Sequence, residues 1–191
     1  ILMFKFRYIL VFALLITSSF LAQETLKIMS YNILNYPDHA DSRDTYFRDI
    51  MEEVSPDILV VNEIKSESAV NRFAEDILGE KYSAGDFIQN GSHHYYNSIS
   101  NAIFYKDSLV EFISNTAIKI SSSDGPRDLN KFRIVHNITE DTLIIYSVHL
   151  KASNNSDARE QRESTVEELR KKTNALPIGT NFLICGDFNL Y

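Results

Sequence analysis

Short apolar runs separated by polar turns recur along the chain and predict β-strands. Residues 26–33 alternate apolar and polar side chains, whereas residues 56–61, 142–148 and 181–185 are dominated by apolar ones. Alternation is typical of a strand with one buried face, and a short apolar run is typical of a strand buried on both faces. The pattern therefore predicts four strands spread over most of the chain.

Apolar residues at helical spacing predict helices between these strands. One apolar face lies between the first two strands and contains Tyr46, Phe47, Ile50, Met51 and Val54. Another follows the second strand and contains Val70, Phe73, Ala74, Ile77 and Leu78. Both faces are expected to cover a sheet. A long helix with interleaved charges is predicted from about residue 157 to residue 174, because Pro177 stops it.

The middle of the chain, residues 82–148, has a different pattern. Its short runs include residues 102–105 and 132–135, and residues 137–141 are typical of a hairpin connection. This region should therefore be mostly antiparallel. Taken together, the residue patterns predict a single mixed α/β domain.

Polar residues that could bind a metal ion or move a proton follow each of the four predicted strands. Asn32 ends the first strand, Glu63 follows the second, His149 follows the third, and Asp187 and Asn189 follow the last. Ligands bind at the carboxyl ends of strands in open α/β layers, so a shared site is one interpretation. The alternatives are ordinary turn residues after the last strand, a histidine packed at a sheet end, and a helix-start acid at Glu63.

Four motifs in order resemble those of the endonuclease/exonuclease/phosphatase superfamily, which includes deoxyribonuclease-I-like nucleases, inositol polyphosphate phosphatases and secreted sphingomyelinases. They occupy residues 29–32, 60–63, 146–150 and 186–189. Asn62 stands where the family often has Gln, a change that keeps an amide. The family's closing motifs, which carry a further Asp and a catalytic imidazole, have no counterpart before Tyr191, so we expect a domain that is incomplete at its C-terminus.

The resemblance implies a four-layer α/β/β/α sandwich and a role for each strand-end residue. Glu63 and Asn32 are expected to bind Mg²⁺, with Mn²⁺ or Ca²⁺ as alternatives, because hard cations prefer oxygen ligands. Asp187 is expected to orient or deprotonate the attacking water. His149 and Asn189 are expected to stabilise the charge that develops on the phosphate.

Three further residues are weaker candidates for contacts with substrate. Arg127 and Lys151 could bind phosphate, although isolated surface bases are usually only solvated. Asn101 begins a strand that the family also uses near its substrate, although Asn is common at such positions.

The first residues are typical of a secretory signal. Lys5 and Arg7 precede an uncharged stretch that ends near Ala22, a stretch too short for an ordinary membrane span. We therefore expect residues 1–22 to direct export to the periplasm or the extracellular space, and residues 23–191 to form the domain. An uncleaved anchor is the alternative. After cleavage we expect no stable membrane association, and no protein partner is predicted.

The sequence as a whole predicts an exported phosphoesterase that depends on a divalent metal and cleaves phosphodiesters, with nucleic acid as the leading substrate. The formal net charge of −7 argues against a broad basic surface for nucleic acid, although a metal would add local positive charge. The alternatives are a lipid or sugar-phosphate phosphodiesterase or phosphatase, and a non-catalytic binding domain. We expect little turnover from the fragment itself, because the closing motifs are missing.

Overall fold

The computed structural model describes residues 25–89, 99–120 and 128–190. The predicted signal, residues 1–22, lies outside these ranges. Within them, no helix is both long and apolar enough to cross a membrane.

Among the described residues, eight strands form two four-stranded sheets. In the first sheet the order is β1-β2-β4-β3, and the strands are β1 (Ile28–Tyr36), β2 (Ile58–Ile64), β4 (Ser100–Tyr105) and β3 (Ser83–Ala84). In the second sheet the order is β5-β6-β7-β8, and the strands are β5 (Val110–Ile118), β6 (Leu129–His136), β7 (Thr142–His149) and β8 (Asn181–Asp187). Only the β1–β2 and β7–β8 pairs are parallel, so the pairing is mostly antiparallel, as the sequence predicts.

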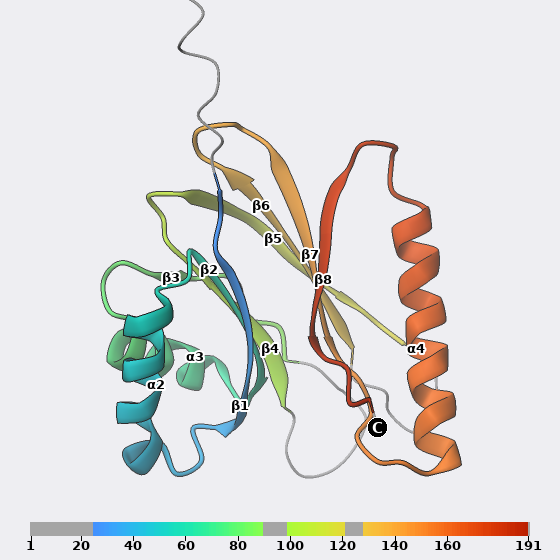
Figure 1. Ribbon diagram of the computed structural model, residues 1–191, viewed down its shortest axis with the longest axis horizontal. Helices are drawn as coiled ribbons and strands as arrows, with labels where there is room; N and C mark the ends of the chain where they lie inside the picture. The colour runs from blue at the N-terminus through green and yellow to red at the C-terminus, as the bar shows by residue number, and fades with distance from the viewer. Residues whose placement is uncertain (1–24, 90–98, 121–127, 191) are drawn as a thin grey trace, which may run out of the picture.

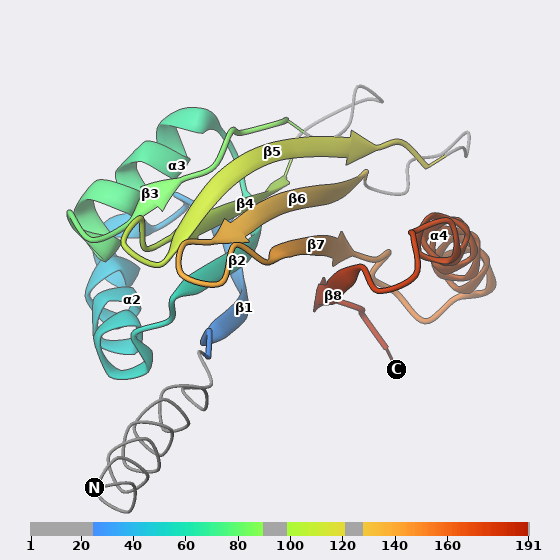
Figure 2. The ribbon, with the colours of Figure 1, turned by 90° about the horizontal axis from the view of Figure 1, so that it is seen from above.

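The helices form the two outer layers. They are α2 (Ala40–Val54), α3 (Glu67–Phe73), which continues into the π-helical turn η2 (Ala74–Leu78), and α4 (Ser156–Asn174). Figure 1 shows α2 and α3 beside the β1–β4 sheet and α4 beside the β5–β8 sheet, and Figure 2 shows the two sheets stacked between them. The layer order is α/β/β/α, so the predicted architecture is confirmed.

Local sequence explains where the helices begin. Ser66 accepts a hydrogen bond from the Ala69 N–H at 3.2 Å, and Asn155 accepts one from the Ala158 N–H at 2.8 Å. Such caps satisfy N–H groups that have no partner within the helix. One residue of the predicted α2 face is misplaced: Tyr46 is 68% exposed, whereas its neighbour Phe47 is buried. A helix turns about 100° per residue, so Tyr46 lies beyond the edge of the apolar stripe.

Three apolar layers hold the four structural layers together. The first packs α2 and α3 against the β1–β4 sheet through residues such as Phe47, Phe73 and Phe104. The second fills the space between the two sheets, and its members include Val60 and Phe132. The third packs α4 against the β5–β8 sheet and shares no residue with the other two layers. The second layer matters for the site, because it holds together the two sheets whose strands β2, β7 and β8 end there.

Candidate active site

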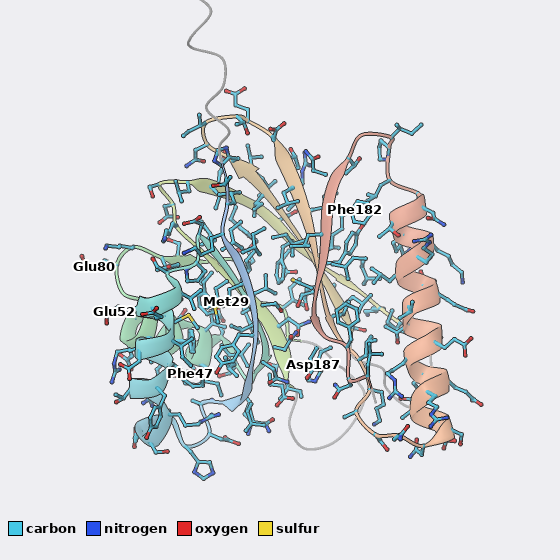
Figure 3. The ribbon with its side chains drawn as sticks, viewed as in Figure 1. Met29, Phe47, Glu52, Glu80, Phe182 and Asp187 are labelled. Carbon is cyan, nitrogen blue, oxygen red and sulfur yellow. The ribbon has the colours of Figure 1, made fainter. Side chains whose placement is uncertain are left out.

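Four of the predicted residues meet where the two sheets face each other. Asn32 and Glu63 come from β1 and β2 of one sheet, and His149 and Asp187 come from β7 and β8 of the other. Both parallel pairs end at this edge, and His149 lies in register with Asp187. Asp187 is labelled there in Figure 3, between the two sheets.

The Asn32 side chain links two carboxylates that belong to different sheets. Its Nδ2 donates to Glu63 Oε1 at 3.0 Å and to Asp187 Oδ2 at 2.9 Å. Its Oδ1 accepts the Leu34 N–H at 2.9 Å, which turns the amide nitrogen toward the carboxylates. Asn32 therefore bridges the sheets directly at the site.

Glu63 is held in an unusual backbone conformation. Its φ is 67°, and the pairing of β2 with β4 shifts between Asn62 and Ile64, so Glu63 forms a bulge. Bulges redirect side chains, and a left-handed non-glycine residue costs free energy that functional sites commonly tolerate. The redirected carboxylate accepts the Asn35 N–H on Oε2 at 3.1 Å, and its Oε1 lies 3.4 Å from His149 Nε2.

The turn after β8 depends on a glycine. Gly186 has a φ of 133°, and a Cβ at this position would lie 1.9 Å from the Val148 carbonyl oxygen. Only Gly allows β8 to approach β7 this closely. The turn then places the Asn189 N–H 3.0 Å from Asp187 Oδ1, and Asn189 Nδ2 donates to the Leu150 carbonyl at 2.9 Å. The turn therefore orients Asp187 and, as far as the described residues go, leaves one Asn189 amide hydrogen for another acceptor.

The sequence model of the Endonuclease/Exonuclease/phosphatase family matches residues 29–191, and this match identifies the family. The chain belongs to this family. Members of the family hydrolyse phosphate esters. A search of curated proteins finds no significant match.

Solved structures from the family share the fold. TDP2 from D. rerio in complex with a single-stranded DNA product has a TM-score of 0.67 at 18% identity, over 87% of this chain and 61% of that one. A mannosyl-6-phosphatase from Bacteroides thetaiotaomicron has a TM-score of 0.67 at 19% identity, over 87% and 66%. The human Nocturnin catalytic domain with bound sulfate has a TM-score of 0.61 at 16% identity, over 86% and 65%. The chain thus spans about two thirds or less of each of these structures.

The chemistry of the site fits the divalent metals that enzymes of this family generally use. Two carboxylates, Glu63 and Asp187, converge on one neutral amide, an arrangement in which a cation would relieve repulsion between like charges. Their oxygens are hard ligands of the kind that Mg²⁺ prefers. Asn32 Oδ1, in contrast, faces Leu34. Within the described ranges, no cluster of three or more Asp, Glu, His or Cys residues surrounds a single point, so metal binding at Asn32 and Glu63 stays a prediction.

The three weaker substrate candidates lie in different environments. Asn101 is 1% exposed, and its amide is hydrogen-bonded on both sides by other asparagines. Lys151 is exposed just after β7, and its carbonyl accepts a hydrogen bond from Arg162. Arg127 lies outside the described residues. The structure therefore brings neither Asn101 nor Lys151 into the cluster around Glu63, and the role of Arg127 stays a prediction.

Sequence reasoning missed the importance of Asn62. Its position in the second motif is evident, but the residue stood out only as a substitution for Gln. In the structure its side chain is fully buried between the sheets and donates to the Val148 carbonyl at 3.1 Å. The sequence contained a signal for this role. Ile58, Val60 and Asn62 are alternate residues on one face of β2, so an amide in that series must find hydrogen-bond partners in the protein interior.

Proposed function

We propose that this protein is a phosphoesterase that depends on a divalent metal and hydrolyses phosphodiester bonds, with nucleic acid as its leading substrate. The observation that carries the proposal is the bridge from Asn32 Nδ2 to both Glu63 and Asp187, with His149 Nε2 3.4 Å from Glu63. It gathers, from two sheets, the acid, amide and imidazole groups that hydrolysis of a phosphate ester requires.

Each residue has a chemical role in this proposal. Glu63 would hold the metal, together with Asn32 if its amide turns. A bound divalent cation neutralises charge on the phosphate and polarises its oxygens. The Asp187 carboxylate, fixed by the Asn189 N–H, orients the attacking water or accepts its proton. The free Asn189 amide hydrogen and the His149 ring donate to phosphate oxygens as their charge grows.

The choice of substrate rests on chemistry beyond the fold. The structure of TDP2 holds a DNA product, whereas another structure of equal TM-score is a mannosyl-6-phosphatase, so the fold supports diesters and monoesters alike. The net charge of −7 weakens sequence-independent binding to nucleic acid but leaves a local metal-centred site possible. A phosphomonoesterase acting on sugar phosphates is therefore the second candidate.

Hydrolysis by the intact protein tests the proposal. Plasmid DNA, bis-p-nitrophenyl phosphate and p-nitrophenyl phosphate are incubated with Mg²⁺ or with EDTA, using the wild type and Asp187→Asn. We expect cleavage of both diesters with Mg²⁺, none with EDTA, and a loss of about 10²-fold or more in Asp187→Asn, the scale of removing one group that stabilises the transition state. Asp49→Asn on α2 makes the same chemical change far along the chain from the site and should keep the wild-type rate.

The results separate the candidates. Cleavage of the monoester alone would favour the sugar-phosphate phosphatase, and cleavage of the small diester without DNA would favour a lipid or sugar-phosphate diesterase. A folded protein that cleaves none of the three would contradict the proposal and leave the binding interpretation.

We also propose that the protein is exported, on the strength of the charged start and apolar stretch within residues 1–22. Expression in a bacterial host followed by N-terminal sequencing of the periplasmic material tests this. A mature N-terminus at residue 23 is expected. Protein that stays in the cytoplasm with its leader intact would contradict it.

A further inference from the structure

Four asparagine side chains form a chain of hydrogen bonds that crosses from one sheet to the other. Asn62 Nδ2 donates to Asn101 Oδ1 at 2.7 Å, and Asn101 Nδ2 donates to Asn130 Oδ1 at 3.0 Å. Asn130 Nδ2 then donates to Asn115 Oδ1 at 3.0 Å, and Asn115 Nδ2 donates to the Asp86 carbonyl at 2.8 Å. The first three asparagines are at most 1% exposed. We call these four side chains the amide chain.

The two ends of the amide chain fix the direction of every amide in it. At one end Asn62 Nδ2 also donates to the Val148 carbonyl, and at the other Asn115 donates to the Asp86 carbonyl. A carbonyl can only accept, so reversing one amide would place donor against donor or acceptor against acceptor. Aligned amides in a low-dielectric interior strengthen each other, so the amide chain behaves as one unit.

The Asn62 side chain is oriented so that its amide N–H groups, and not its oxygen, find hydrogen-bond partners within the described part of the chain. Its Nδ2 lies within hydrogen-bond distance of Asn101 Oδ1, Val148 O and Ser147 Oγ, whereas its buried Oδ1 has no partner among the described residues. An unpaired buried acceptor is unfavourable. The side chain keeps this orientation because both of its N–H groups are used to join β2 to β4 and β7.

The head of the amide chain lies one residue from the active-site contact. Asn62 precedes Glu63 and Val148 precedes His149, so the Asn62–Val148 bond ties the strands beside the 3.4 Å contact between Glu63 and His149. These strands belong to different sheets. Apolar packing is non-directional and would let the sheets slide, whereas a directional hydrogen bond at this point fixes their register.

We propose that Asn62 is a positioning residue, which, as the head of the amide chain, holds His149 against Glu63 and so sets the rate of the chemical step. The proposal rests on the phosphoesterase function proposed above. It extends that function by assigning a role to a buried side chain that touches neither substrate nor metal.

The test compares the intact wild-type protein with Asn62→Leu, which keeps the size of the side chain but removes both donors, and with Asn62→Gln, which keeps them. Ile134→Ala, in the apolar layer between the sheets, is the control for loss of stability, and assays are run well below both unfolding midpoints. Two readouts are used: kcat and KM for bis-p-nitrophenyl phosphate with Mg²⁺, and the NMR signals of the His149 ring, assigned by their loss in His149→Gln.

We expect Asn62→Leu to lower kcat by roughly 10²-fold with little change in KM, because small misplacements of catalytic groups have effects of that size. Its His149 ring signals should shift. Asn62→Gln should recover most of kcat, and Ile134→Ala should keep both kcat and the ring signals. Asn130→Leu, which breaks the amide chain two links from its head, should lower kcat by less than Asn62→Leu.

Three results would overturn the proposal: wild-type kcat and ring signals in Asn62→Leu, an equal loss of kcat in Ile134→Ala, or an effect of Asn130→Leu larger than that of Asn62→Leu. If Asn62→Leu does not fold, Asn62→Gln and Asn130→Leu decide the question, since wild-type behaviour in Asn130→Leu contradicts the proposal. If the wild type hydrolyses nothing, the phosphoesterase function fails, and the ring signals alone decide whether Asn62 positions His149.

Discussion

The two ends of the interface between the sheets are built from the same strands but from different chemistry. At one end Ile58, Val60, Ile103, Phe132, Ile134 and Ile145 form a continuous apolar layer. At the other end the same inward faces continue as Asn62, Asn101, Asn130, Ser147 and His149. The apolar end joins the sheets through burial, and the polar end fixes their register through directional bonds. The candidate site lies at the polar end.

The difference shows that holding the two sheets together and aligning them with each other are separate tasks in this fold. Burying large apolar side chains stabilises the sandwich but tolerates small shifts, since the hydrophobic effect depends on area and not on direction. Hydrogen bonds to buried amides contribute less net stability but are lost when geometry changes. Substitutions at the two ends should therefore damage different properties.

The largest effect is expected from Glu63→Gln at the polar end. It keeps the size of the side chain but removes the negative charge that the bulge presents to the site. A metal held by such a charge stabilises the transition state by several kcal/mol. Mg²⁺-dependent hydrolysis of bis-p-nitrophenyl phosphate should fall about 10³-fold or more, with the free energy of unfolding within about 1 kcal/mol of wild type.

Glu52→Gln is the matched control for that prediction. Glu52 lies on α2 in the helical layer, well away from Asp187 in Figure 3. Equal losses of activity in the two variants would mean that general charge, and not the polar end, controls the rate.

At the apolar end, Phe132→Ala should mainly affect stability. Phe132 is fully buried between the sheets, and removal of such a side chain costs about 3–5 kcal/mol. Urea unfolding should show this loss, while the kcat of the folded protein stays near wild type. Phe182→Ala, at a site 46% exposed on β8, should cost less than about 1 kcal/mol. A collapse of kcat in folded Phe132→Ala would show that the apolar end also aligns the site.

Gly186→Ala should damage both properties, because β8 must move away from β7. The added Cβ would lie 1.9 Å from the Val148 carbonyl oxygen, and we expect a loss of about 2–4 kcal/mol together with most of the activity. Gly179 also has a positive φ, of 86°, but has no atom within 4 Å of its added Cβ. Gly179→Ala should therefore show only the smaller cost of backbone strain, and equal losses in thermal unfolding would argue against the close approach.

The smallest effect is expected at Asp57, beside the apolar end, and concerns how the stability of the fold changes in acid. Burial acts to raise the pKa of Asp57, but the Lys27 N–H at 2.8 Å and Lys106 Nζ at 2.9 Å outweigh it and hold that pKa below its ordinary value. A lowered folded-state pKa gives stability that is present above the unfolded pKa, about 3.9, and is lost as the pH falls through the folded value.

Asp57→Asn should accordingly remove about 1 kcal/mol of stability at pH 7 and little at the lowest pH, measured by urea unfolding across the acid range. Hydrolysis at neutral pH should not change. A difference between the two proteins that stays constant from pH 7 to pH 2 would contradict the assigned cause.

Most of the strands and helices followed from the sequence because their periodicity is local, although β3 and β5 were not among the predicted runs. Residues 142–148 predict β7, and the cap at Asn155 agrees with the predicted start of α4. The polar strand ends likewise predicted the meeting of Asn32, Glu63, His149 and Asp187. Tyr46 was wrongly assigned to the buried face of α2, because helical periodicity predicts an apolar stripe but not where that stripe ends.

The amide chain could not be predicted with the same ease, because its partners are distant in sequence. Asn62 and Asn101 are on neighbouring strands, but Asn130 and Asn115 belong to the opposite sheet, and only the stacking of the sheets brings them together. The bulge at Glu63 was equally hidden, since no glycine marks its positive φ.

The measurement that tests the account most directly is a crystal structure of the intact protein soaked with Mn²⁺, whose anomalous signal locates the ion. The account predicts one strong peak where the sheets meet, about 2.0–2.5 Å from a Glu63 oxygen and on the Asp187 side, absent from Glu63→Gln crystals. An ion bound elsewhere, or a peak that survives in Glu63→Gln, would contradict the claim that the polar end of the interface is a metal-dependent active site.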